Sequence, residues 1–173
     1  MEGRRAQPKP HRPAKSWEVW LESQAEVFLL YARSQTRSEA DAYDVLQEAL
    51  TEAWTKSGRA TPDKQLVFAT IRRRAIDLGR SIDRRTRREQ SVAGDDVAWF
   101  VPDYSAGDTR EHLASAIGEL PANLREALLL RVWGGMSFPE IAELTGTPVA
   151  TATSRYRYAL QRMRESESLI ELR

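Results

Sequence analysis

The sequence has no cysteine and only two histidines, His11 and His112. Without cysteine, the chain can form no disulfide, no thiolate metal site and no cysteine nucleophile. It also lacks an apolar run long enough for a membrane span or for the core of a signal peptide. We therefore expect a cytoplasmic protein with no membrane insertion, no cofactor and no bound metal ion.

The motifs of common enzyme chemistry are missing as well. The sequence has no glycine-rich phosphate loop, no nucleophile elbow and no pair of histidines at helical spacing. Three carboxylates, Asp41, Asp44 and Glu48, could hold a divalent metal ion, but no histidine lies near them. We therefore expect a protein that is not an enzyme, and a metal-dependent hydrolase is the weakest of the alternatives.

Charge is almost balanced overall, at +1, so net charge gives no argument for nucleic-acid binding. The charges are nevertheless segregated, because residues 1–15 and 72–88 are basic whereas acidic residues gather at 18–26 and 39–52. Arginine holds phosphate and guanine in a fixed fork. Only Asp77 and Asp83 within the second basic stretch, and Glu89 next to it, are acidic. This favours a nucleic-acid surface at 72–88, with a solvated helix end or a targeting run as alternatives.

Apolar periodicity predicts an all-α fold class, with two small helical domains joined by a flexible linker. The first fifteen residues are polar and contain proline, which predicts a disordered basic arm. The predicted boundaries are 1–15 for the arm, 16–90 for the first domain, 91–108 for an acidic linker and 109–173 for the second domain.

Three helices are predicted in the first domain. The first covers residues 17–31, and the second extends from its N-cap at position 38 to about position 56. The third has apolar residues at alternating steps of three and four over 68–82. Trp54 and Phe68 flank the loop between the last two helices and could stack on an unpaired base. Aromatic residues at helical spacing are more often core, so we expect both in the core.

Residues 121–164 have the pattern of a buried helix followed by a helix-turn-helix motif. Ser137 and Glu140, three positions apart, predict a capping box at the start of the first helix of this motif. The preceding Gly134 and Gly135 predict a left-handed end for the helix before it. One helix therefore ends and another begins near position 136.

Small residues and caps also predict the turn inside this motif. Ala142 suits a place where two helices approach closely, and Gly146 suits a turn that requires positive φ. Thr147 is then expected as an N-cap and Pro148 as the first helical residue. The spacing therefore predicts that a second helix follows the turn at once.

The helix that begins near position 149 has two different faces. Its apolar stripe is expected to face its own domain and consists of Val149, Ala152, Tyr156, Leu160 and Met163. The opposite face carries hydroxyl, amide and guanidinium groups that can contact phosphates and base edges. Its residues are Thr151, Thr153, Ser154, Arg155, Arg157, Tyr158, Gln161 and Arg162. No acidic residue occurs between positions 149 and 164. A helical hairpin with a solvated basic face is the alternative.

Asp44, Gln47, Glu48 and Thr51 lie at helical spacing on the polar face of the second predicted helix. Many polar helix faces of this kind only contact water and have no binding function. A docking surface for a basic partner is the functional alternative.

Together these segments resemble bacterial extracytoplasmic-function (ECF) sigma factors over nearly all of residues 17–165. The first domain carries ADAYDVLQEALTEAW and FATIRRRAIDLGRSIDRR, and the second carries LPANLREALLLR and GMSFPEIAELTGTPVATATSRYRYALQRMR. The second domain is the stronger part of the resemblance. The residues in the positions of that family's region 4 motif are Glu140, Ile141, Ala142, Gly146, Val149, Thr151, Ser154 and Arg155.

The resemblance implies an alternative sigma factor that binds core RNA polymerase and directs promoter recognition and transcription initiation. It assigns Asp44, Gln47 and Glu48 to polymerase binding. It assigns minus-10 DNA to the first domain, through Arg72, Arg73, Arg74, Asp77, Arg80 and Arg84. It assigns minus-35 DNA to the second, through Thr151, Thr153, Ser154, Arg155, Arg157 and Tyr158. Promoter DNA and core polymerase are thus the expected partners, and the resemblance also allows an anti-sigma factor. A stand-alone helix-turn-helix transcriptional regulator is the alternative.

Overall fold

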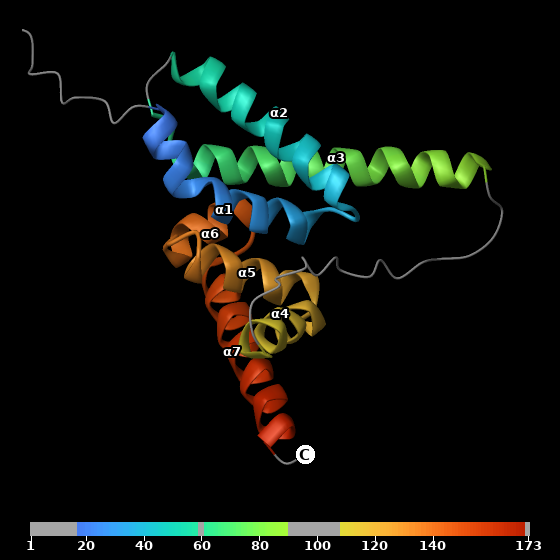
Figure 1. The fold of residues 1–173 in the computed structure, drawn as a ribbon, viewed down its shortest axis with the longest axis vertical. Helices are drawn as coiled ribbons and strands as arrows, with labels where there is room; N and C mark the ends of the chain where they lie inside the picture. The colour runs from blue at the N-terminus through green and yellow to red at the C-terminus, as the bar shows by residue number, and fades with distance from the viewer. Residues whose placement is uncertain (1–16, 59–60, 90–107, 172–173) are drawn as a thin grey trace, which may run out of the picture.

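The computed structural model describes residues 17–58, 61–89 and 108–171, and these residues are mostly helical (Figure 1). The helices are α1 (Trp17–Gln35), α2 (Glu39–Ser57), α3 (Lys64–Glu89), α4 (Asp108–Glu119), α5 (Ala122–Val132), α6 (Phe138–Thr145) and α7 (Val149–Glu171). No strand occurs in these three ranges, which confirms the predicted all-α class. The predicted arm over 1–15 and nearly all of the predicted linker over 91–108 lie outside the described residues.

Helices α1, α2 and α3 pack against one another and form the N-module, residues 17–89 (Figure 1). The side chain of Ser38 accepts a hydrogen bond from the backbone N–H of Asp41, as expected for the N-cap of α2. The core contains edge-to-face rings, with the Phe68 centroid 5.1 Å from Phe28 and 5.2 Å from Tyr31. Phe68 is 1% exposed, which confirms its predicted core position.

Helices α4 to α7 form the C-module, residues 108–171, in which α5 packs along α7. The predicted capping box is present, because Ser137 and Glu140 bond to each other's backbone N–H groups at the start of α6. Gly135, with φ of 61°, provides the left-handed residue after α5, and Gly146, with φ of 66°, ends α6. The helix-turn-helix geometry therefore follows from the local sequence signals.

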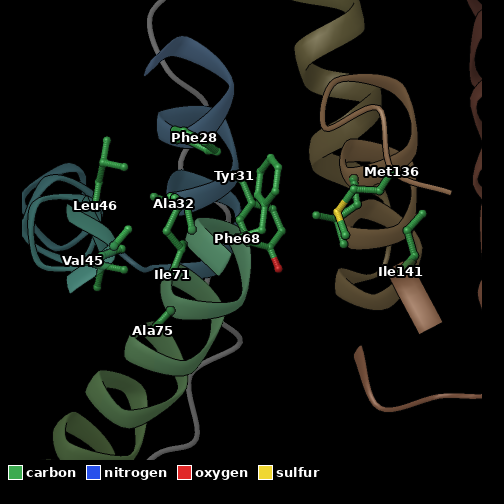
Figure 2. Close-up of a cluster of buried hydrophobic side chains, with 14 of the residues drawn as sticks. Phe28, Tyr31, Ala32, Val45, Leu46, Phe68, Ile71, Ala75, Met136 and Ile141 are labelled. Carbon is green, nitrogen blue, oxygen red and sulfur yellow. The ribbon is translucent and has the colours of Figure 1, made fainter. Parts of the chain in front are cut away.

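The two modules share one hydrophobic core, which the sequence did not predict. Leu130, Met136 and Ile141 of the C-module are fully buried in the same cluster as Phe68 and Tyr31. Figure 2 shows Met136 and Ile141 on one side of this cluster and the N-module side chains on the other. Helix α1 contacts α5, and α3 contacts α6. The described helices therefore form one packed body.

Three local expectations were wrong. Trp54 is 38% exposed at the end of α2, because its main ring neighbour, Trp17 at 4.7 Å, also lies at the surface of the module. Val149 is 46% exposed, since it lies in the first turn of α7, outside the buried stripe that begins at Ala152. The helix begins one residue later than expected, because the carbonyl of Pro148 accepts the first helical bonds and so occupies the N-cap position.

Among the described helices, none has the length and hydropathy that crossing a membrane would require.

Candidate nucleic-acid interface

Helix α7 presents the predicted polar face away from the core of the C-module. Ala152 and Ala159 are buried on the inner side, and the ring of Tyr156 packs at a tilt against that of Phe138 of α6, with centroids 5.6 Å apart. The guanidinium of Arg131 lies over the ring of Phe138, 4.9 Å from its centroid. These contacts fix the rotation of α7 about its own axis and so determine which side chains point outward.

The predicted minus-35 residues all lie on this helix and are all accessible. Thr151, Thr153, Ser154 and Arg155 are half-buried, and Arg157 and Tyr158 are exposed. In the described part of the chain, Arg155 and Arg157 form no ion pair. The hydroxyls of Thr153 and Ser154 donate to backbone carbonyls of the same helix, so each hydroxyl oxygen can still accept a bond. The helix therefore offers two unpaired guanidiniums beside acceptor groups.

The predicted minus-10 residues all lie on α3, but several are already paired with acidic residues. Arg73 donates to Glu52 of α2 at 2.6 Å, and Arg74 donates to Glu52 and Glu48, each at 3.1 Å. These acids lie on a neighbouring helix, so charge patterns along the chain do not identify them as partners of the arginines. Helical spacing alone could not show which side of α2 would face α3.

Farther along α3 the predicted residues are open to solvent. Asp77, Arg80 and Arg84 are exposed, and the nearest ion-pair distance between Asp77 and Arg80 is 4.0 Å. A shallow groove of about 300 Å³ follows this face. It is lined by Ala69, Arg72, Arg73, Ile76, Asp77, Arg80 and Leu144. The last of these residues belongs to α6, so the C-module forms one edge of the groove.

Glu52 carries the strongest electrostatic perturbation at this surface. Hydrogen bonds from Lys56, and then from Arg74 and Arg73, lower the pKa of its carboxyl to about 2. A lowered pKa stabilises the folded state above pH 4.5, the ordinary value for the carboxyl, and this contribution is lost as pH falls through about 2. The stability that Glu52 contributes through its ion pairs between α2 and α3 is therefore expected to be lost in acid.

We predict that Glu52→Gln flattens the dependence of stability on pH between about 4.5 and 2. The wild-type protein should lose urea resistance over this range, and the variant should lose less because its side chain does not titrate. Glu22→Gln, at an exposed position of α1, is the control and should follow the wild type. Parallel curves for wild type and Glu52→Gln would contradict the assignment.

Arg72 differs from its neighbours because it points toward the C-module. Its Nε donates to Oε1 of Glu126 in α5 at 3.0 Å, and the Tyr31 hydroxyl donates to the same oxygen at 2.9 Å. Glu126 is 7% exposed. Burial, together with the charge of Glu126, raises the pKa of Tyr31 well above its ordinary value, so this hydroxyl remains a proton donor at neutral pH.

The predicted polymerase-binding residues lie together on the outer face of α2. Asp44, Gln47 and Glu48 are exposed, and Glu48 also pairs with Arg74. Within the described residues no cluster of three or more histidine and carboxylate side chains could hold a metal ion, so Asp41, Asp44 and Glu48 do not converge on one. The patch therefore offers carboxylate and amide groups to solvent and has no metal-binding geometry.

Comparisons with known proteins agree with this arrangement. The family model described as Sigma-70, region 4 matches residues 110–163. An ECF RNA polymerase sigma factor, SigL of Mycobacterium tuberculosis, is 30% identical over 150 residues, covering 81% of this chain and 82% of the relative. The RNA polymerase sigma-E factor of Streptomyces avermitilis is 30% identical over 162 residues, covering 90% and 87%.

The fold is also similar to solved structures. The sigma factor RpoE from Bartonella quintana, solved in complex with the anti-sigma factor NepR, superposes with a TM-score of 0.69 at 24% identity. The superposition covers 89% of this chain and 98% of that one. The similarity extends across both modules.

Proposed function

The chain belongs to the ECF sigma factor family, and from that premise we propose which of its surfaces meets each partner. It is an alternative sigma factor that binds core RNA polymerase and directs promoter recognition and transcription initiation. It is not an enzyme, because the polymerase carries out the chemistry. The C-module reads minus-35 DNA through α7, and the N-module separates the strands of minus-10 DNA along α3.

The outward face of α7 is the observation that carries this proposal. A recognition helix contacts base edges with the residues of its N-terminal half. Here those residues include Arg155 and Arg157, and both are accessible and without an acidic partner in the described ranges. The capping box of α6 and the left-handed Gly146 hold the helix in position. The face therefore supports direct contact with the major groove.

Two further parts of the proposal concern the setting in which the protein acts. Because core polymerase and promoter DNA are its partners, we place the protein in the cytoplasm. An anti-sigma factor is a further proposed partner, supported by the fact that the similar RpoE chain was solved with NepR. We also propose that the two domains extend over residues 16–90 and 109–173.

Run-off transcription tests the proposed function directly. Purified core polymerase should initiate at specific sites only when this protein is added, and mapping of the start sites should identify the promoter elements. A stand-alone regulator would instead require the housekeeping sigma factor. Family membership argues against a stand-alone regulator. That alternative also gives no function to the N-module.

We predict that Asp44→Arg weakens capture of core polymerase, because reversing a charge at a complementary surface places like charges together. Pull-down with tagged core enzyme should retain about tenfold less of the variant than of the wild type. Glu22→Arg is the control, since Glu22 is an exposed carboxylate of α1 outside the proposed patch. Undiminished capture of Asp44→Arg would remove α2 from the proposed polymerase surface.

A further inference from the structure

A series of ion pairs connects the proposed polymerase patch on α2 with the groove on α3. Glu48, in the patch, pairs with Arg74 at 3.1 Å. Arg74 also donates to Glu52 at 3.1 Å, and Glu52 accepts two further bonds from Arg73, at 2.6 and 2.8 Å. Arg73 lines the groove on the face that we assign to minus-10 DNA. These four side chains form an ion-pair relay between the two proposed surfaces, within the N-module.

The geometry at Glu52 makes its two arginine partners competitors. Nη2 of Arg73 and Nη2 of Arg74 donate to the same oxygen, Oε2, whereas Lys56 donates to Oε1. A guanidinium binds a carboxylate most strongly through two parallel hydrogen bonds. Arg74 does not form such a pair of bonds with Glu52, because its Nη1 is directed to Glu48. Arg74 is therefore divided between two carboxylates.

The Nε–H of Arg74 shows what this division costs. The Nε atom is buried and, in the described part of the chain, has no hydrogen-bond partner. A buried donor without an acceptor costs free energy, so an arrangement that gives it an acceptor is favoured. Two parallel bonds from Nε and Nη2 to Glu52 would provide that acceptor. They would also take the oxygen that Arg73 now shares.

We propose that Arg74 is a positioning residue that couples polymerase binding at Glu48 to DNA binding at Arg73. This inference rests on the proposed function, in which α2 meets core polymerase and α3 meets minus-10 DNA. A cationic group of the polymerase that pairs with Glu48 removes this carboxylate from Arg74. Arg74 then turns fully to Glu52 and displaces Arg73, whose guanidinium becomes available to a DNA phosphate. Coupling of this kind is reciprocal, so DNA at Arg73 also favours polymerase binding at Glu48.

The exposure of the side chains permits this exchange of partners. The side chains of Glu48 and Arg73 are 57% and 51% exposed, so both ends of the ion-pair relay are accessible. Glu52, at its centre, is only 17% exposed. Ion pairs between exposed groups contribute little to stability, so replacing one partner by another costs little. The relay can therefore respond to a partner while α2 and α3 remain folded.

Nuclear magnetic resonance of the arginine side chains tests the ion-pair relay in the full-length protein. Glu48→Gln imitates the capture of Glu48, because glutamine keeps the shape of the side chain and removes its charge. The Arg74 Nε–H should then exchange with water about threefold more slowly, and the Arg73 guanidinium should rotate about threefold faster, as expected for exposed ion pairs. Glu22→Gln removes the same charge from an exposed position of α1 and should change neither rate. Unchanged rotation of Arg73 in Glu48→Gln would overturn the inference.

Arg74→Lys separates the positioning role from a general effect of charge. Lysine keeps the positive charge but cannot form two parallel bonds with a carboxylate. In the Arg74→Lys background, adding Glu48→Gln should therefore leave the rotation of Arg73 unchanged, which completes a double-mutant cycle. If Glu48→Gln speeds this rotation equally in both backgrounds, the positioning role of Arg74 is rejected.

A promoter strand supplies the functional part of the test. A single-stranded minus-10 oligonucleotide, from a promoter mapped by run-off transcription, is titrated into each variant while the Arg73 signals are followed, so binding at α7 does not enter the measurement. At one salt concentration, Glu48→Gln should bind about threefold more tightly than the wild type. Equal affinities would overturn the inference. If the oligonucleotide shifts the Arg73 signals in no variant, the proposed minus-10 role of α3 is contradicted instead, so the two failures are distinguishable.

Discussion

Phe68→Ala should lower the free energy of unfolding by about 3 to 5 kcal/mol, which is the usual cost of truncating a buried phenylalanine. The ring is buried and makes edge-to-face contacts with Phe28 and Tyr31. Its removal leaves a cavity in the core that the two modules share. Urea unfolding followed by circular dichroism measures the change.

Ala69→Ser is the matched control for this experiment. Ala69 is the next residue of α3 but is exposed, so its substitution should change stability by less than about 0.5 kcal/mol. A loss below about 1 kcal/mol for Phe68→Ala would mean that the aromatic cluster is not the centre of the fold.

Arg155→Ala should weaken promoter binding by about 1 to 3 kcal/mol if the guanidinium reads a base edge. The side chain lies in the second turn of α7, is half-buried and has no ion pair in the described ranges, so its removal breaks no ion pair. Holoenzyme affinity for a promoter mapped by run-off transcription, measured at one fixed salt concentration, gives the value.

The variant Arg162→Ala distinguishes a specific contact with a base from a general electrostatic effect on DNA affinity. Arg162 is exposed on the same helix two turns farther on, beyond the half that enters a groove in a typical recognition helix. It should cost much less affinity than Arg155→Ala. Equal losses would indicate a non-specific electrostatic role for both residues, and unchanged affinity for Arg155→Ala would remove it from the interface.

Local signals explain why so much of the fold was predictable. The N-cap at Ser38, the capping box of Ser137 with Glu140 and the left-handed Gly146 each act within a few residues of the chain. Such interactions depend on the spacing of residues along one helix, and this spacing can be read directly from the sequence. The starts of α1, α2 and α6 and the turn were therefore predicted closely. The start of α7 is displaced by one residue, α1 ends four residues later than predicted, and α3 extends beyond 68–82 at both ends.

The candidate site was predictable only in part, because charge partners come from other helices. Along the sequence Arg72, Arg73 and Arg74 form one basic run. In the structure Arg72 pairs with α5, whereas the other two pair with α2. The roles assigned to these residues stay predictions until the promoter is known.

The sequence by itself determined six of the seven described helices, the helix-turn-helix and the accessible polar face of α7, since these depend on periodicity and capping within single segments. Only the tertiary structure decided that the two modules share a core and that Glu126 lies against Arg72. The physical reason is that packing between modules depends on shape and charge complementarity between residues 54 positions apart, which no local pattern contains.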